Sequence, residues 1–205
     1  MARRRIALGL LAVALVCGAA AAYRLARGHP SIRVDLDRDG IEERVTLYPN
    51  SPITVSLWRG GACIWEGVPR RWQPWKLTTA DVDGDGLPDI AVGVHKSTRY
   101  FPRPHNCLFI YGFDGEEVTP KWLGSSLNQT FTDFTFANLD DDHADELIAI
   151  ERQLDRTYCV TIYSWRQFGF EVDRREGAWQ EARFEKTNNG SVVVRADGQR
   201  LPIAR

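Results

Sequence analysis

The sequence predicts an all-β fold built from about three four-stranded, propeller-like repeats (a partial or atypical β-propeller), preceded by an N-terminal signal or anchor segment. One observation is that acidic residues recur at alternate positions in three segments, which begin at Asp35, Asp81 and Asn138. A spacing of roughly 50 residues is typical of repeat architectures such as propellers. The other is that apolar residues alternate with a period of two on both sides of each segment, which indicates strands.

The first 28 residues are expected to lie outside this fold. Arg3, Arg4 and Arg5 precede an uncharged run from Ile6 to Ala22. A charged start followed by an apolar stretch is typical of a signal peptide, and the run also has the minimum length of a membrane anchor. Both interpretations remain open, and both predict that residues 29–205 form one exported, extracytoplasmic domain, secreted or anchored to the membrane through residues 1–28.

The remainder of each repeat is predicted to form short strands separated by turn residues. Gly60-Gly61 and Asn189-Gly190 mark two hairpins. The expected strand segments are 44–49, 53–58, 62–67, 72–82, 89–94, 107–113, 117–124, 132–139, 146–152, 159–165, 168–175, 179–186 and 191–198. Three blades are fewer than the four to eight of closed propellers, so an open arc, a compact stack and part of an oligomeric ring remain alternatives. In an open arrangement, the last hairpin is a candidate cover for an exposed sheet edge.

The three acidic segments are candidate metal loops. They read DLDRDG from Asp35, DVDGDG from Asp81 and NLDDDH from Asn138. Carboxylates that converge in a short turn repel each other by roughly 4 kcal/mol per pair at about 4 Å and an effective dielectric constant of about 20. A hard divalent cation makes this arrangement favourable, and an oxygen-only ligand set selects calcium.

An EF-hand is the nearest alternative for such a loop, and the sequence argues against it. An EF-hand needs a glutamate at loop position 12 and a helix on each side. Position 12 is Thr46, Val92 and Ala149 in the three copies, and the flanking segments have the period of strands.

The segment DVDGDGLPDIAV, from Asp81, resembles the calcium loop of FG-GAP/VCBS repeats, which form the blades of integrin-α-like β-propellers. The third copy departs from the pattern, with Asn138 at position 1 and His143 in place of the glycine at position 6. The resemblance implies five calcium ligands per loop, through side chains at positions 1, 3, 5 and 9 and the carbonyl at position 7. They are Asp35, Asp37, Asp39, Ile41 and Glu43; Asp81, Asp83, Asp85, Leu87 and Asp89; and Asn138, Asp140, Asp142, Ala144 and Glu146.

One connection, residues 95–106, is long and mixes basic with aromatic residues. Such a loop is a candidate partner site, because connections carry binding residues more often than the strands do. His95 and His105 bracket it and are candidates to face each other; the plain alternative is a solvated loop with Phe101 packed on the core. The candidate partner-binding residues are Arg99, Tyr100, Phe101, Arg103 and His105.

Composition narrows the function further. The net charge is −1, with the acidic residues concentrated in the loops and no basic stripe, so nucleic-acid binding is not expected. Cys63, Cys107 and Cys159 are interpreted as small buried hydrophobic residues. No GxSxG, HExxH or phosphate-binding glycine motif is present in the sequence. We therefore expect a non-catalytic, calcium-stabilised module that binds a protein or a cell-envelope glycan; the alternative is an envelope enzyme acting on polysaccharide with the repeats as scaffold.

Overall fold

The structure is a computed structural model that describes residues 29–124, 126–140, 142–187 and 191–204. The predicted signal or anchor segment, residues 1–28, lies outside the described residues. Within them the protein is all-β, as predicted, with one short 3₁₀ turn and four antiparallel sheets. None of the described segments is a helix with the length and apolarity needed to cross a membrane.

The first three sheets are four-stranded meanders, so the prediction of three four-stranded repeats is confirmed. The first contains β1 (Ser31–Val34), β2 (Glu43–Leu47), β3 (Ile53–Arg59) and β4 (Ala62–Pro69). The 3₁₀ turn η1 (Arg70–Trp72) leads to β5 (Pro74–Ala80), β6 (Asp89–Lys96), β7 (His105–Phe113) and β8 (Val118–Gly124). The third sheet contains β9 (Phe131–Ala137), β10 (Glu146–Arg152), β11 (Tyr158–Arg166) and β12 (Gly169–Trp179).

The chain ends in a smaller, three-stranded sheet of β13 (Ala182–Glu185), β14 (Val193–Ala196) and β15 (Gln199–Pro202). The strands of the last predicted hairpin are present as the antiparallel pair of β13 and β14, while its turn residues Asn189 and Gly190 lie outside the described residues. The sequence analysis missed β15, which pairs with β14 across a turn where Asp197 and Gly198 both have positive φ.

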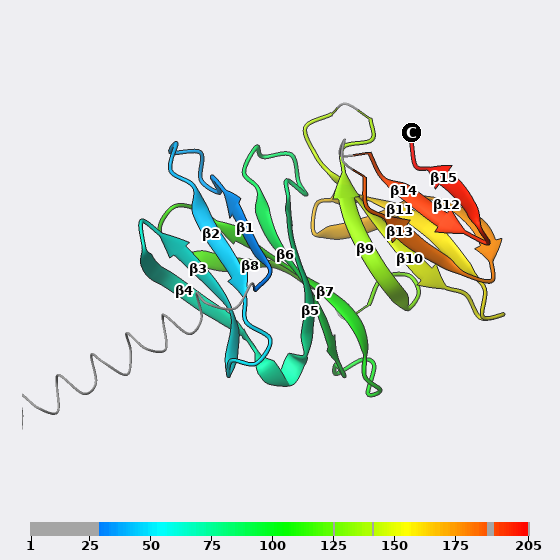
Figure 1. The fold of residues 1–205 in the computed structure, drawn as a ribbon, viewed down its shortest axis with the longest axis horizontal. Helices are drawn as coiled ribbons and strands as arrows, with labels where there is room; N and C mark the ends of the chain where they lie inside the picture. The colour runs from blue at the N-terminus through cyan, green and yellow to red at the C-terminus, as the bar shows by residue number, and fades with distance from the viewer. Residues whose placement is uncertain (1–28, 125, 141, 188–190, 205) are drawn as a thin grey trace, which may run out of the picture.

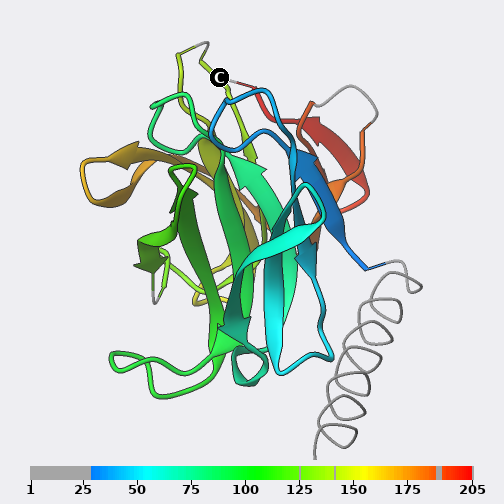
Figure 2. The same ribbon diagram turned by 90° about the vertical axis from the view of Figure 1, so that its left-hand side faces the viewer.

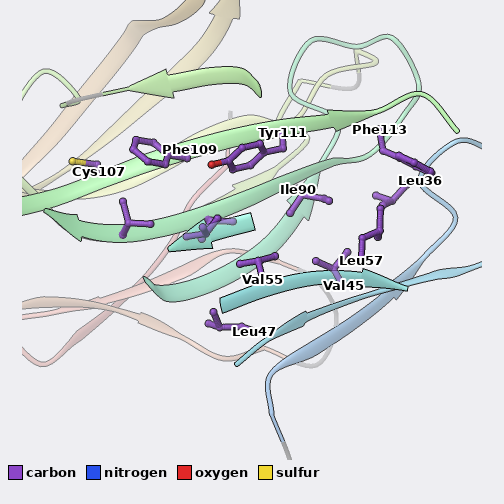
Figure 3. Packing of buried hydrophobic residues seen from close by; sticks show 13 residues of the cluster. Leu36, Val45, Leu47, Val55, Leu57, Ile90, Cys107, Phe109, Tyr111 and Phe113 are labelled. Atoms are coloured by element: carbon purple, nitrogen blue, oxygen red, sulfur yellow. The ribbon is translucent and has the colours of Figure 1, made fainter. Parts of the chain in front are cut away.

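The sheets stand side by side as a row, with the first sheet at one end and the three-stranded sheet at the other (Figure 1). Each gap between neighbours is filled by its own hydrophobic cluster. The first joins β2 and β3 to β6 and β7, with Val45 and Leu57 facing Ile90 and Phe109 (Figure 3). The second cluster lies between the second and third sheets, and the third joins the third sheet to β14.

This packing explains why β6 and β10 are apolar on both faces. Ile90, Val92 and Val94 point into the first cluster, whereas Ala91 points into the second. Side chains alternate between faces along a strand, so a central strand packed on both sides needs an unbroken apolar run. Within the described chain the three-stranded sheet covers the outer face of the third blade, the role expected of the closing hairpin.

The row is tightest along the first strand of each blade. β1 contacts β5, and β5 contacts β9. Each of these strands leads into an acidic loop, and the three loops consequently emerge together at the upper end in Figure 1. The view of Figure 2, turned so that the first sheet faces the reader, shows the same gathering of the β1–β2 and β5–β6 loops.

The cysteine prediction is correct for two of three residues. Cys107 and Cys159 are buried, but Cys63 is exposed, so that prediction was wrong. Cys63 lies on β4, the edge strand of the first sheet, most of whose residues are exposed or half-buried.

Candidate metal centres

The acidic side chains converge in all three loops. Each loop has three carboxylates with ligand oxygens within 4.8 Å of one another: Asp35, Asp37 and Asp39; Asp81, Asp83 and Asp85; and Asp140, Asp142 and Glu146. Antiparallel strands flank each loop, so the EF-hand is excluded. Three oxygens at this spacing form part of the shell that a hard divalent cation needs.

Backbone hydrogen bonds to the carboxylates set the shape of the first two loops. The N–H groups of Gly40 and Gly86 donate to Asp35 Oδ2 (2.9 Å) and Asp81 Oδ2 (2.8 Å), respectively. Gly40 and Gly86 have φ values of 89° and 88°, a conformation that glycine adopts without steric cost. The position-1 aspartate thus closes the turn while its carboxylate stays directed into the loop.

Another hydrogen bond repeats in all three loops. The N–H at position 7 donates to the carboxylate at position 5 over 2.8 Å, in Ile41, Leu87 and Ala144 alike. These three residues, whose carbonyls the family resemblance assigns as ligands, therefore occupy one turn position.

The position-9 acids anchor the base of each loop. They are buried and accept a hydrogen bond from the position-2 backbone N–H, as in the pair of Glu43 with Leu36 (2.9 Å). The same bond measures 3.4 Å to Asp89 and 2.7 Å to Glu146. Burial raises the pKa of Asp89 to about 6, and burial likewise raises the pKa of Glu146. Removing these carboxylates from water favours a nearby cation.

The third loop departs from the first two where its sequence does. The side-chain amide of Asn138 donates to the carbonyl of Asp142, a bond that the aspartates at position 1 of the first two loops cannot make. His143 does not have the positive φ of Gly40 and Gly86. The convergence of Asp140, Asp142 and Glu146 survives these changes.

One atom in the first loop tests directly whether a cation fits. Asp35 Oδ1 is buried and accepts no hydrogen bond, while the other oxygen of the same carboxylate accepts from Gly40. A buried carboxylate oxygen without a donor is costly, and a metal ion removes that cost. The donor set of the loop therefore fits calcium.

Two cationic side chains at these loops were not predicted from the sequence. Arg59 Nε lies 2.6 Å from Glu43, and its Nη2 contacts Asp37. Lys121 Nζ lies 2.9 Å from both Asp83 and Asp89. Neither residue is close in sequence to the loop that it contacts, so no local motif reveals them.

The second and third loops are also joined to each other, through Asp145, which was not among the predicted ligands. Asp145 and Asp81 exchange backbone and side-chain bonds: Asp145 N–H donates to the Asp81 carbonyl (2.6 Å), and Asp81 N–H donates to Asp145 Oδ2 (3.0 Å). A Cβ on Gly84 would lie 3.4 Å from the Ala144 nitrogen, so the second and third loops pack backbone to backbone. The only sequence signal was a second acid directly before Glu146.

The predicted partner loop lies at the opposite ends of the strands, between β6 and β7. Tyr100 is 77% exposed and Phe101 is 49% exposed, so Phe101 is not packed on the core. Arg99 and Arg103 belong to the same exposed segment. His105 begins β7, and its ring lies against that of Phe101 in a tilted arrangement, with the ring centroids 5.3 Å apart and the planes at 58°.

The expectation that His95 and His105 face each other was wrong. The register pairs His95 with Asn106 and Lys96 with His105, which puts the two histidines on opposite faces of the sheet. His95 Nδ1 lies 2.9 Å from Asn106 Oδ1. These two side chains line a hollow of about 550 Å³ together with Pro49, Arg70, Gln73, Pro74 and Trp75.

The fold and its loops define a β-repeat protein with acidic turns between the first two strands of each blade. A comparison with protein families matches residues 35–92, from the first loop into β6, to the FG-GAP-like repeat. The matched segment contains the first and second acidic loops, and the resemblance of these two loops to FG-GAP repeats is confirmed. A comparison with curated proteins finds no match to the chain.

Proposed function

We propose that the protein is an exported, non-catalytic β-repeat module that calcium stabilises and that binds a protein or cell-envelope glycan partner through its loops. The observation that carries the proposal is the convergence of carboxylates in all three loops, at one end of three adjacent blades. Carboxylates this close together repel one another, and a divalent cation bound between them would offset that repulsion.

The ligands proposed for calcium are the side chains at positions 1, 3, 5 and 9 of each loop and the backbone carbonyl at position 7. When bound, the ion supplies the positive charge that offsets carboxylate repulsion. The protein holds the ligand oxygens in place. The backbone N–H groups of Gly40 and Gly86 donate to the position-1 carboxylates, and the position-9 acids accept hydrogen bonds from the position-2 N–H groups. A ligand that binds only the folded state stabilises it by roughly 2.7 kcal/mol at a hundredfold excess over Kd.

Export and calcium binding support each other in this proposal. Residues 1–28 have the pattern of a signal peptide or anchor. Outside the cytosol, calcium reaches the concentrations at which extracellular modules of modest affinity are loaded.

For the partner site we favour the β6–β7 loop. It presents Arg99, Arg103 and the exposed ring of Tyr100 beside the hollow that Arg70 and Trp75 line. Aromatic faces and guanidinium groups together suit an anionic glycan or an acidic protein surface.

A calorimetric calcium titration tests the metal assignment. We expect the wild-type protein to bind calcium, Asp83→Ala to remove binding at the second loop, and Asp142→Ala to have the smaller effect. Titration of the wild type without any heat of binding or change in stability would reject the calcium proposal.

A sedimentation assay with insoluble peptidoglycan, whose peptides carry carboxylates, tests the glycan branch of the partner proposal. Tyr100→Ala combined with Arg99→Ala should release the protein from the pellet. Leu154→Ala, at a position 97% exposed on the β10–β11 turn, is the control and should leave binding unchanged. Equal sedimentation of all three proteins would place the binding surface elsewhere.

A further inference from the structure

We propose that Arg59 and Lys121 are resident counter-cations of the first and second loops: they hold these loops folded without a metal ion, and calcium must displace them to bind. The first half of the inference concerns the chain alone. The second half rests on the proposed calcium binding, and the experiment below separates the two.

In the second blade, the fold delivers Lys121 to the loop through two local irregularities. The register of β7 and β8 pairs Ile110 with Trp122 and Tyr111 with Pro120, so Lys121 is the extra residue of a β-bulge. Bulges re-aim a side chain that regular pairing would direct elsewhere.

The second irregularity is Gly112 of β7, which the register sets across from Asp89, because Ile90 pairs with Tyr111. A Cβ on Gly112 would lie 3.5 Å from both Lys121 Cε and Asp89 Oδ1, so these two side chains meet over the bare glycine. The ammonium group lies 2.9 Å from Asp83 and 3.4 Å from Asp85, two of the proposed ligands. Lys121 therefore contacts three of the four side chains proposed as ligands in this loop, Asp83, Asp85 and Asp89.

In the first blade, the cation comes from the residue opposite the position-9 acid. The β2–β3 register pairs Arg44 with Trp58, which puts Arg59 across from Glu43. Besides Glu43, the guanidinium contacts Asp37 and lies 3.5 Å from Asp39. The Cζ atom of Arg59 lies 5.3 Å from the centroid of the Phe113 ring in the next blade. This cation–π contact helps to hold the guanidinium group in place.

The third blade provides a natural contrast. Its register pairs Leu147 with Tyr163, so the residue across from Glu146 is Ser164, which cannot carry a charge. Within the part of the chain that the structure describes, neither Asp142 nor Glu146 forms an ion pair with a lysine or arginine. The same register position thus holds arginine, glycine with a lysine reaching over it, and serine in the three blades.

A side chain with one positive charge and an ion with two compete for the same oxygens in this arrangement. Without metal, the side chain offsets part of the carboxylate repulsion, so the loop stays closed. When calcium enters, the side chain must leave, and the apparent affinity falls by the free energy of the ion pairs that break. Removing the cation should therefore weaken the metal-free protein and tighten calcium binding.

Thermal melts in excess chelator at neutral pH test the first half. Lys121→Met should lower Tm by roughly 5 °C, because Asp83, Asp85 and Asp89 lose their counter-charge. Lys121→Arg keeps the charge and should stay near the wild type. Lys186→Met, an exposed lysine after β13, removes one charge away from the loops and should not change Tm. If Lys121→Met and Lys186→Met have the same Tm in chelator, the inference is overturned, regardless of the result of the calcium titrations.

Calcium titrations of the same proteins test the second half. We expect Lys121→Met to bind calcium with a roughly tenfold lower Kd than the wild type. Lys121→Arg should bind calcium as weakly as the wild type. Calcium affinity that is the same in all variants, despite a lower melt in chelator, would contradict displacement. A third outcome is that neither the wild type nor Lys121→Met binds calcium, while Lys121→Met still has a lower Tm than the wild type in chelator. The proposed calcium function is then wrong and the counter-cation role is supported. Should Lys121→Met fail to fold, Arg59→Met makes the same tests at the first loop.

Discussion

The tie between the second and third loops yields a prediction whose size follows from its geometry. Asp145→Ala removes the carboxylate that accepts from the Asp81 N–H at 3.0 Å. A hydrogen bond to a charged acceptor contributes about 1.5–3 kcal/mol. Part of this is offset in the wild type, because burial and then the charges of Asp81 and Asp142 raise the pKa of Asp145. We expect a net loss of about 1–2 kcal/mol, or a Tm lower by roughly 2–8 °C for a domain of this size.

Asp145→Asn separates the hydrogen bond from the charge. The asparagine carbonyl can accept the same N–H, while repulsion from the neighbouring acids disappears, so this variant should stay within about 0.5 kcal/mol of the wild type. Urea unfolding of the three proteins in chelator measures the difference. A loss in Asp145→Asn as large as that in Asp145→Ala would refute the reasoning, since the hydrogen bond would then not be the stabilising element.

Three further outcomes test the packing and the buried acid. Phe134→Ala, at a fully buried position between the second and third sheets, should lower the free energy of unfolding by about 3–5 kcal/mol, whereas Phe168→Ala, 87% exposed, should leave the urea midpoint unchanged. Gly93→Val should cost about 1–3 kcal/mol or more in the same assay, because a Cβ there would lie 2.9 Å from the Phe134 and Trp75 rings; an unchanged midpoint would show that these sheets are not so close. In chelator, the stability of the wild type relative to Asp89→Asn should fall as pH rises from about 4 to about 6, because burial raises the folded-state pKa of Asp89 to about 6 from an ordinary 3.8; a rise over this range would contradict the burial of that carboxyl.

The sequence was sufficient for features that depend on neighbours along the chain. Alternating acids with a glycine at position 6 dictate a turn whose carboxylates converge, and Asp81 to Asp89 fold as expected. The flanking period of two identified the strands, and it correctly excluded an EF-hand. Where the third loop departs from the sequence pattern, its conformation departs too: His143 lacks the positive φ of the glycines at the same position in the first two loops.

Features that depend on register between strands were not visible in the sequence. Lys121 reaches the second loop only because a bulge and Gly112 coincide beside it, and neither follows from a local pattern. The error on His95 and His105 has the same origin, since one step in register decides which face a side chain takes. Cys63 was misjudged because a strand at the sheet edge reads like one in the interior.

A pair of thermal melts of the wild-type protein, one in millimolar calcium and one in excess chelator, tests the central claim most directly. If the convergent carboxylates bind calcium and thereby fasten the three blades at their common end, Tm is higher in calcium, and Asp83→Ala removes much of the increase. Identical melting temperatures in calcium and in chelator would contradict the claim.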